Sequence, residues 1–362
     1  MNARHSHLEP FYVELAAGQT VLWCRCGKSR RQPYCDGSHQ GTGFVPIRYQ
    51  AQKAEEVLLC GCKQTSTGPH CDGSHNALAQ DYANDDARSP ANRDIVEVEP
   101  DADGKARIDG GCFVCKVDAR PWREQGNALW TDLINDADGA CFQAQFCFDF
   151  APGIGPVVSF GDRHVALLVL DQFGVLEIGS QPFALDTRIA GDKTRSAEVG
   201  AYVKPGECFR VTNHGDRAMR VFASTGPTTG APQFLEQLPK QFDASAGHRL
   251  ASVNPAERQA MADRFFQVLV NKTHGSPMLT QFIGEIPKGK AWPHRHLYEE
   301  SLIVVAGEGM MWTETRKTRV AAGDVIFLPR KQTHSLECTS DSPMFVAGVI
   351  YPGDNPSINY YP

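Results

Sequence analysis

The sequence predicts a mainly β fold that is divided among two or three domains. The chain has 362 residues, which exceeds the usual size of a single domain. From residue 94 onward, short apolar stretches such as 165–170 and 174–178 recur between turn residues, and 102–104 marks a hairpin between 95–98 and 106–108. Strands that are this short and regularly spaced are typical of a β-sandwich or a β-barrel.

Composition argues against two classes of partner. The formal net charge is −6 and the basic residues form no block, so we expect no nucleic-acid partner. A membrane helix needs a run of about 18 apolar residues, and the sequence has none, so we expect no membrane partner. The first residues also lack the apolar stretch of a signal peptide. We therefore expect a cytoplasmic protein.

The first part of the chain carries one cysteine–histidine pattern twice, at 24–39 and at 60–75. Both copies read C-x-C-x2-[ST]-x3-P-x-C-D-G-S-H, and each follows a stretch with the apolar pattern of a strand. Three thiolates and one imidazole suit either zinc or a two-iron cluster. Zinc fingers usually pair their cysteines as C-x2-C, so the C-x-C spacing favours the cluster.

At every motif position this pattern resembles the CDGSH iron–sulfur family, the mitoNEET-like proteins. The resemblance implies one [2Fe-2S] cluster on each copy of the motif, and it implies a monomeric pseudo-dimer, because both motifs lie in one chain. Because a neutral imidazole replaces one thiolate, each cluster is expected to have a higher reduction potential than an all-cysteine cluster. The implied cluster ligands are Cys24, Cys26, Cys35 and His39 for the first site, and Cys60, Cys62, Cys71 and His75 for the second.

A second group of potential metal ligands lies in the last hundred residues. His294 and His296 are two residues apart, so on a strand they would share one face. A carboxylate four residues further on, Glu300, and the distant His334 could complete a site of three nitrogens and one oxygen. Such a site suits iron, manganese, nickel, cobalt or zinc as a mononuclear divalent ion, with positions left open. Glu299 could replace Glu300, although the parity of the strand favours Glu300.

This segment resembles the two cupin motifs, H-x-H-x3-E-x6-G at 294–307 and G-x5-P-x4-H at 323–334. The resemblance implies a double-stranded β-helix, or jelly-roll, barrel whose metal ligands are His294, His296, Glu300 and His334. The chain departs from the motif at Lys331, where glycine is usual, and at Cys338, where asparagine is usual. Neither residue is a ligand, so these departures affect the expected turn geometry and leave the metal site intact.

Residues 140–225 resemble a second, degenerate cupin. The stretch 204–211 parallels 321–328, while 156–159 falls where the paired histidines fall in the other half, so this half is expected to hold no metal. The predicted organisation is a tandem iron–sulfur domain at 1–80, a linker at 81–94, a degenerate cupin at 95–240 and a metal-binding cupin at 241–362. Asn254, followed by Pro255 and Glu257, predicts a helix that starts there and runs towards Gly275.

Residues near the expected cupin metal are candidates for substrate chemistry. Tyr298 shares the parity of the ligands, and together with Trp292, Trp312 and Phe327 it is expected to line the barrel. Arg330 and Lys331 would lie near the mouth, where they could hold an anionic substrate. Tyr298 and Arg330 are therefore the catalytic candidates. Cys112 and Cys115 are three apart on an expected strand, so their sulfurs should point to opposite faces and form no redox pair.

Two hypotheses of function follow. In the first, the protein is an oxidoreductase in which cupin-bound iron and dioxygen oxidise a small molecule, with electrons supplied by the two clusters. No nicotinamide or flavin motif is present, so this hypothesis requires an external reductase. In the second, the protein is a non-enzymatic redox sensor or cluster-transfer protein, and the cupin binds a ligand.

Overall fold

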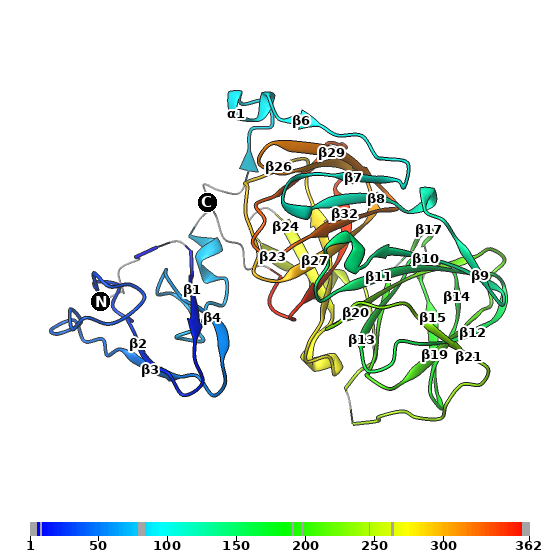
Figure 1. The fold of residues 1–362 in the computed structure, drawn as a ribbon, viewed down its shortest axis with the longest axis horizontal. Coiled ribbons are helices and arrows are strands. Elements are labelled where there is room, and N and C mark those ends of the chain that lie inside the picture. The colour runs from blue at the N-terminus through cyan, green and yellow to red at the C-terminus, as the bar shows by residue number, and fades with distance from the viewer. Residues whose placement is uncertain are drawn as a thin grey trace. The chain divides into compact units, whose positions relative to one another are not determined.

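The computed structural model describes residues 6–7, 9–78, 84–189, 192–196, 198–245, 247–261 and 264–356. The chain divides into two compact units, the first formed mainly by residues before Asp86 and the second by most of the residues that follow. Strands dominate the described chain, which confirms the predicted mainly β fold (Figure 1). No helix within the described ranges is long and apolar enough to cross a membrane.

The first unit consists of two antiparallel strand pairs, β1 with β4 and β2 with β3. Each pair takes one strand from each sequence repeat, because β1 and β2 precede the first motif while β3 and β4 precede the second. Their inward side chains, including Trp23, Val57 and Leu59, form one small shared core. The elements are β1 (Phe11–Leu15), β2 (Thr20–Trp23), β3 (Ile47–Gln50), β4 (Glu55–Leu59) and a 3-10 turn (Ser74–Ala77).

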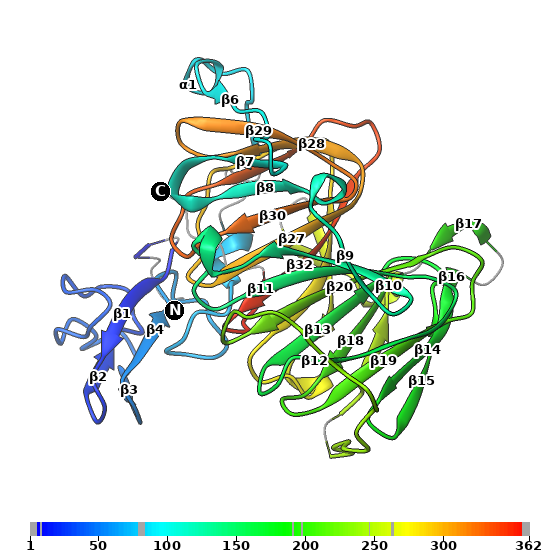
Figure 2. The same cartoon turned by 45° about the vertical axis from the view of Figure 1, so that its right-hand side comes forward.

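The second unit contains two jelly-roll barrels that lie side by side (Figure 2). The first barrel has a large sheet in the order β22-β18-β13-β20-β11-β10-β9 and a smaller sheet in the order β15-β14-β19-β12-β21. Its strands are β9 (Arg123–Gln125), β10 (Ala128–Ile134), β11 (Ala144–Phe150), β12 (Gly153–Ser159), β13 (His164–Val169), β14 (Phe173–Ile178), β15 (Gln181–Asp186), β18 (Val199–Val203), β19 (Cys208–Asn213), β20 (Met219–Gly226), β21 (Gln233–Leu235) and β22 (Leu250–Ser252). A separate pair joins β16 (Arg188–Ile189) to β17 (Asp192–Ser196).

The second barrel has a large sheet in the order β23-β24-β25-β32-β27-β30-β8-β7, and a smaller sheet that includes β26-β31-β28-β29-β6. The strands are β6 (Val96–Glu97), β7 (Lys105–Arg107), β8 (Phe113–Lys116), β23 (Gln259–Met261), β24 (Arg264–Val270), β25 (Thr280–Ile286), β26 (Gly289–Ala291), β27 (Glu299–Ala306), β28 (Glu308–Trp312), β29 (Arg316–Ala321), β30 (Asp324–Leu328), β31 (Ser335–Cys338) and β32 (Met344–Tyr351). The remaining elements are β5 (Asn84–Asp85), α1 (Pro90–Arg93) and short 3-10 turns.

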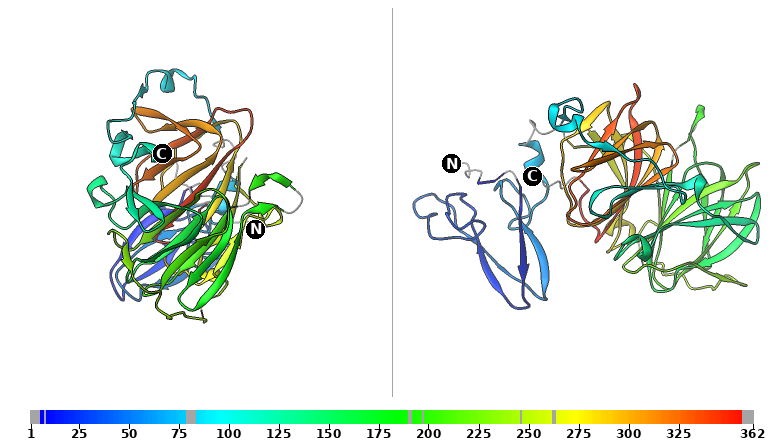
Figure 3. Two further views of the ribbon diagram at one scale, coloured as in Figure 1. Left: turned by 90° about the vertical axis from the view of Figure 1, so that its right-hand side faces the viewer. Right: turned by 45° about the horizontal axis from the view of Figure 1, so that its top comes forward.

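The three largest apolar clusters among the described residues of this unit stabilise it. One fills the first barrel, around Phe146, Phe148 and Phe209, and a second fills the other barrel, around Leu302 and Ile326. The third cluster takes residues from both large sheets, which face each other where the barrels meet (Figure 3). Alternation of side chains along each strand explains this arrangement, because one face of a large sheet lines its own barrel while the other face packs against the neighbour.

The chain exchanges strands between the barrels, so neither barrel is one continuous segment of the sequence. β7 and β8 precede the first barrel in sequence, but β8 pairs with β30 of the second barrel, with Phe113 opposite Phe327. In return, β22 follows the expected boundary at residue 240 and pairs with β18 of the first barrel. The expected linker also contains α1, a single turn that the Ser89 hydroxyl caps by accepting a hydrogen bond from the Asn92 backbone N–H.

The helix expected from Asn254 to Gly275 is not formed. The Asn254 side chain does accept a hydrogen bond from the Ala256 backbone N–H, but the turn ends at Glu257 and strand β24 follows at Arg264. The physical reason is the apolar pattern of β24, in which Phe266 and Val268 pack into one barrel while Leu269 joins the cluster between the barrels. Burial on both faces of a strand overrides a local capping signal.

Candidate metal centres

Each cysteine–histidine motif folds so that its four expected ligands form two close pairs. In the first motif the Sγ atoms of Cys24 and Cys26 lie 3.7 Å apart, and Cys35 Sγ lies 3.2 Å from His39 Nδ1. The second motif repeats the arrangement, with 3.5 Å between the Sγ atoms of Cys60 and Cys62 and 3.4 Å between Cys71 Sγ and His75 Nδ1. The four predicted ligands of the first motif thus have the same arrangement as the four of the second.

Backbone and aspartate hydrogen bonds hold the two motifs in the same conformation. The Cys24 N–H donates to the Pro33 carbonyl, and the Cys60 N–H donates to the Pro69 carbonyl in the same way. Asp36 accepts from two backbone N–H groups within its motif, at 2.9 and 3.0 Å, and Asp72 does so at 2.8 and 3.1 Å. The hydroxyl groups of Ser38 and Ser74, helped by these backbone N–H groups, lower the pKa of Asp36 and, against the opposing effect of burial, that of Asp72. Both aspartates therefore remain anionic anchors of the loops, and neither belongs to the close ligand pairs.

The two ligand pairs of each motif differ in exposure. The C-x-C cysteines are buried in both motifs, whereas Cys35 and Cys71 are partly exposed. His39 is also partly exposed, while His75 is buried. The C-x-C pair of each site therefore faces the core of the unit, while Cys35 and His39 of the first site and only Cys71 of the second are partly exposed.

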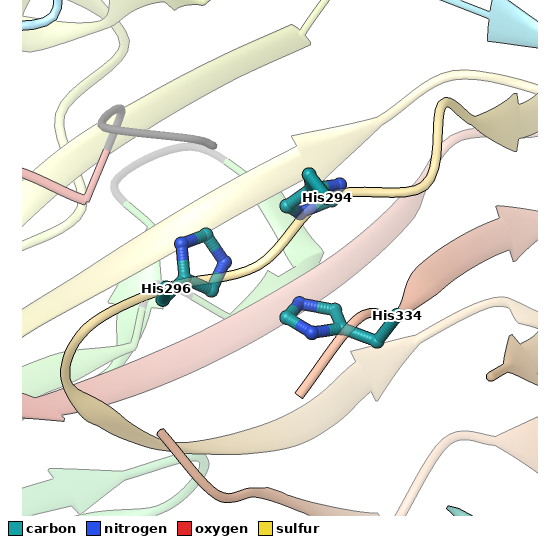
Figure 4. Close-up of side chains that lie close together, drawn as sticks. All are labelled: His294, His296 and His334. Carbon is teal, nitrogen blue, oxygen red and sulfur yellow. The ribbon is translucent and has the colours of Figure 1, made fainter. Parts of the chain in front are cut away.

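The second barrel brings together His294, His296 and His334, whose ligand atoms all lie within 4.8 Å of one another (Figure 4). His294 and His296 precede β27 outside the regular strands, and His334 directly precedes β31. The first two rings meet edge to face, with their centroids 5.0 Å apart. This places three of the predicted metal ligands in one cluster.

Two of these histidines present a defined nitrogen to the centre of the cluster. His294 Nδ1 lies 2.8 Å from the Trp292 carbonyl oxygen, and His334 Nδ1 lies 2.9 Å from the Gln332 carbonyl oxygen. A carbonyl oxygen can only accept, so Nδ1 carries the proton in each ring and Nε2 offers its lone pair. Burial lowers the pKa of His334 to about 4, which favours the neutral imidazole that metals bind.

Neighbouring glutamates on β27 point to opposite sides of its sheet. Glu300 shares its face with Leu302 and Val304, which line the second barrel, and burial raises its pKa to about 8. Glu299 shares its face with Ile303, which belongs to the cluster between the barrels. The three-histidine group does not include Glu300, which lies on the interior face of the same barrel.

Glu299 is an anchor between the barrels. Its carboxylate accepts hydrogen bonds from the backbone N–H groups of Cys141, Phe142 and Gln143 at 2.8, 3.0 and 2.9 Å. The Gln143 side-chain amide donates a hydrogen bond of 2.5 Å to the Glu299 backbone carbonyl. The sequence analysis missed this role, and the only signal was the parity that placed Glu299 on the face away from the ligands.

The other residues expected near the metal fall into separate environments. Tyr298 packs in the cluster that fills the second barrel, whereas Phe327 packs against Phe113 between the barrels, so the expectation that Phe327 lines the barrel is wrong. Its strand position gives the reason, since Phe327 alternates with Ile326 and Leu328 on the interior face. Trp312 donates from Nε1 to Glu337 at 2.9 Å.

Arg330 and Lys331 follow the second cupin motif's proline. Arg330 Nε donates to the Leu297 carbonyl at 2.5 Å, which ties the arginine to the segment between His296 and Tyr298. Lys331 has a backbone φ of +68°, the left-handed conformation that glycine adopts most easily. Lys331 therefore adopts the backbone conformation that the usual glycine would adopt at this turn.

Cys112 and Cys115 lie as the strand argument predicted. Cys112 packs in the cluster inside the second barrel, and Cys115 packs in the cluster between the barrels. Burial raises the pKa of both thiols, that of Cys115 to about 11, so neither is a reactive thiolate near neutral pH.

Comparison with known proteins identifies the first unit. Residues 6–40 match the family model described as iron-binding zinc finger CDGSH type. Over 46 residues the chain is 54% identical to the human CDGSH iron-sulfur domain-containing protein 3, mitochondrial, covering 12% of this chain and 36% of that protein. The mouse protein of the same name is 52% identical over 46 residues, covering 12% and 34%. The chain spans about a third of these relatives, and its N-terminal module is of the CDGSH iron–sulfur type.

Comparison also identifies the second barrel. Residues 283–350 match the family model for the cupin domain. The structure is similar to Lactobacillus farciminis oxalate decarboxylase in its formate complex, with a TM-score of 0.51 and 11% identity over 67% of this chain and 86% of that one. It is also similar to a putative glyoxylate induced protein from Pseudomonas aeruginosa, with a TM-score of 0.51 and 14% identity over 70% and 94%. These likenesses establish the jelly-roll fold of the two-barrel unit.

Proposed function

We propose that this chain is an iron–sulfur metalloenzyme that uses dioxygen as the oxidant to oxidise a small anionic molecule, with dioxygen accepting electrons from both the substrate and the clusters. In this proposal two [2Fe-2S] clusters in the N-terminal module supply electrons to one mononuclear iron in the second barrel. The observation that carries the proposal is the group of three converging histidines in a chain that also holds a CDGSH module.

The donor set of the second barrel fits a divalent transition metal. His294, His296 and His334 would hold the ion, with Glu300 as the proposed fourth ligand from the interior face of β27. Three imidazoles and one carboxylate suit iron, manganese, cobalt, nickel or zinc, and an octahedral ion would keep two positions open. The metal would supply Lewis-acid and one-electron redox chemistry. The carbonyls of Trp292 and Gln332 keep two imidazoles in the tautomer that binds.

The paired ligands of the first unit fit two-iron clusters. Each iron of such a cluster needs two protein ligands, and each motif offers one pair of thiolates and one thiolate–imidazole pair. Bond lengths of roughly 2.3 Å to sulfur and 2.1 Å to nitrogen place two ligands of one tetrahedral ion somewhat under 4 Å apart. The pair distances of 3.7 and 3.2 Å in the first motif and 3.5 and 3.4 Å in the second are close to this value, which supports two clusters in one chain.

A small anionic substrate is supported by the residues around the three-histidine group. Arg330 Nε donates to the carbonyl of Leu297, which lies between His296 and Tyr298 in the sequence, and we propose that the rest of its guanidinium holds a substrate carboxylate. Tyr298 would orient the substrate from the same segment. The similarity in fold to an oxalate decarboxylase, whose name specifies oxalate as its substrate, is consistent with a small carboxylate.

The presence of a redox module favours a reaction in which the barrel iron changes its oxidation state. A metal that acts only as a Lewis acid needs no electrons, so an attached electron carrier would serve no purpose. We propose an external reductase as the source of electrons, which the clusters would pass on one at a time.

The test separates the two metal centres by mutation. Changing His294 and His296 to alanine should abolish barrel iron and turnover while the cluster absorption remains. Changing Cys35 and Cys71 to alanine should remove the clusters and stop reductase-driven turnover, while one round with chemically reduced iron persists. Iron and acid-labile sulfide assays on anaerobically purified protein verify each loss. Full reductase-driven turnover without clusters would contradict the electron-supply role.

A cluster-transfer or sensor function is the second candidate, and it is favoured by the partial exposure of Cys35, His39 and Cys71. An exposed edge allows an acceptor thiol to reach the cluster. Transfer of cluster absorption to an apo-ferredoxin by the His294 and His296 double variant, at the rate of the unchanged protein, would support this candidate if no oxidation activity is found.

A further inference from the structure

The two CDGSH motifs differ at one buried position. The residue after the second cysteine is Gly27 in the first motif and Lys63 in the second. Both have a left-handed backbone, with φ of +76° and +64°, which glycine adopts easily and lysine rarely. Lys63 is also buried, with only 6% of its surface exposed. The chain therefore keeps a lysine where the backbone conformation favours glycine.

The Lys63 ammonium lies where the two motifs meet. Its Nζ donates a hydrogen bond of 2.8 Å to the Cys60 carbonyl, at the first ligand of the second motif. The same carbonyl accepts a bond of 2.9 Å from the indole N–H of Trp23, which directly precedes Cys24 of the first motif. The ammonium also lies 4.9 Å from the centre of the Trp23 ring. Trp23 and Lys63 thus join the beginnings of both motifs at one oxygen atom.

The charges around Lys63 come from both motifs. A buried ammonium is costly unless anionic groups surround it, because it has lost its hydration. The ammonium is bonded to the carbonyl of Cys60 and lies against the ring of Trp23, which precedes Cys24, so anionic clusters on both motifs would offset this cost.

We infer that Lys63 is a positioning residue for electron transfer, whose buried ammonium is shared by both clusters and raises both of their reduction potentials. This inference rests on the proposed [2Fe-2S] clusters. Each cluster gains one negative charge when an external one-electron reductant reduces it, and no bond at Lys63 forms or breaks. A positive charge held in a region of low dielectric stabilises that added charge more than an exposed one would.

The experiment is an anaerobic redox titration of the full chain, followed by the visible absorption of the clusters. Lys63→Met removes the charge but keeps the length of the side chain, Lys63→Gly restores the residue of the first motif, and Lys63→Arg keeps the charge. Lys28→Met is the matched control, because Lys28 lies two residues after Cys26 but is exposed. The midpoint potentials of both clusters should fall in the methionine and glycine variants and remain close to the original in the arginine and Lys28 variants.

The outcomes are distinguishable from failure of the proposed function. If the unchanged protein contains no iron and no acid-labile sulfide, the proposed clusters are contradicted before any variant is compared. Unchanged midpoints in Lys63→Met and Lys63→Gly at full cluster content would overturn the inference. If the midpoint potential shifts for only half of the total absorbance change, the charge acts on one cluster and is not shared. Loss of clusters from both variants but not from Lys63→Arg would assign the charge to cluster retention, which also contradicts a role in the potential.

Discussion

Single residues with the same chemistry have different roles here because strand alternation separates them. Glu299 and Glu300 are adjacent carboxylates, yet one anchors the neighbouring barrel and the other lies on the interior face with the apolar lining. The face of a strand that a residue occupies follows from its sequence position alone. This is why Glu300 could be favoured over Glu299 as the candidate metal ligand. The partners of Glu299 come from a turn more than 150 residues earlier in the chain, and no local pattern contains that information.

Replacing Glu299 with glutamine should destabilise the two-barrel unit by about 2 kcal/mol, because a neutral amide accepts weaker hydrogen bonds than a carboxylate and would leave buried N–H groups poorly satisfied. Urea unfolding followed by tryptophan fluorescence measures the change. Glu308→Gln is the control, since Glu308 is exposed at the start of β28. An unchanged unfolding midpoint in Glu299→Gln would contradict the anchoring role.

His164 in the first barrel should make stability depend on pH. Its Nδ1 lies 2.6 Å from the Tyr202 hydroxyl, and burial, together with Lys204, lowers its pKa below the ordinary 6.5. In the unfolded chain His164 binds a proton more readily than in the folded protein. The contribution of this pKa difference to the free energy of unfolding is therefore present above pH 6.5 and is lost as the pH falls through the lower pKa of the folded state.

His164→Gln should therefore flatten the fall in unfolding free energy between about pH 7 and 5, by at most about 1.4 kcal/mol per pH unit, the limit for one proton. Urea unfolding at three pH values gives the slope. His214→Gln serves as the control, because His214 is exposed. Equal slopes for the His164 variant and the original protein would refute the assignment.

At the scale of elements, the sequence predicted strands more reliably than it predicted their partners. Apolar alternation identified the β-rich stretches, while the capping signal at Asn254 predicted a helix where the chain forms a turn and then β24. That signal is local, whereas the burial of β24 on both faces depends on sheets made from distant residues. The exchange of β8 and β22 between barrels was not predictable for the same reason.

Removal of β7 and β8 should prevent the second barrel from folding stably. Phe113, Val114 and Cys115 are fully buried, and burial of one large apolar side chain contributes about 1.5–3 kcal/mol. The free energy lost with these three side chains, together with the exposure of the edge of β30, is comparable to the whole free energy of unfolding of a typical domain.

Two truncated chains test this expectation. A chain that begins at Asp86 should unfold cooperatively at a temperature close to that of the full chain, whereas a chain that begins at Val117 should aggregate or lack a cooperative transition. Circular dichroism during heating makes the comparison. Equal melting temperatures for the two chains would mean that β8 is dispensable.

At the scale of the whole molecule, two candidate metal centres in one chain could be proposed in advance because the residues that would form them follow short motifs. Ligand spacing is a local property, and the close pairs in the first unit and the three-histidine group follow the motif positions. The division of the chain into two units also agrees with the change in composition after the second motif.

If the clusters supply electrons to the barrel, the chain between the units should act as a tether. A protease site inserted within 76–94 and then cut should make reductase-driven turnover depend on protein concentration, because a tethered donor acts at an effective concentration in the millimolar range. Turnover at several dilutions, before and after cutting, measures this. A rate per molecule that stays independent of dilution after cutting would argue against the tether.

The exchanged strands also constrain how the protein is made on the ribosome. β8 is complete at Lys116, but its partner strand begins at Asp324, 208 residues later, where the two residues form an ion pair. During synthesis the edge of β8 that pairs with β30 must therefore remain unpaired while the entire first barrel is translated, although β7 can already pair with the other edge. Such long delays expose strand edges to other chains and slow the final assembly. We expect the nascent chain to need protection by chaperones until β30 emerges.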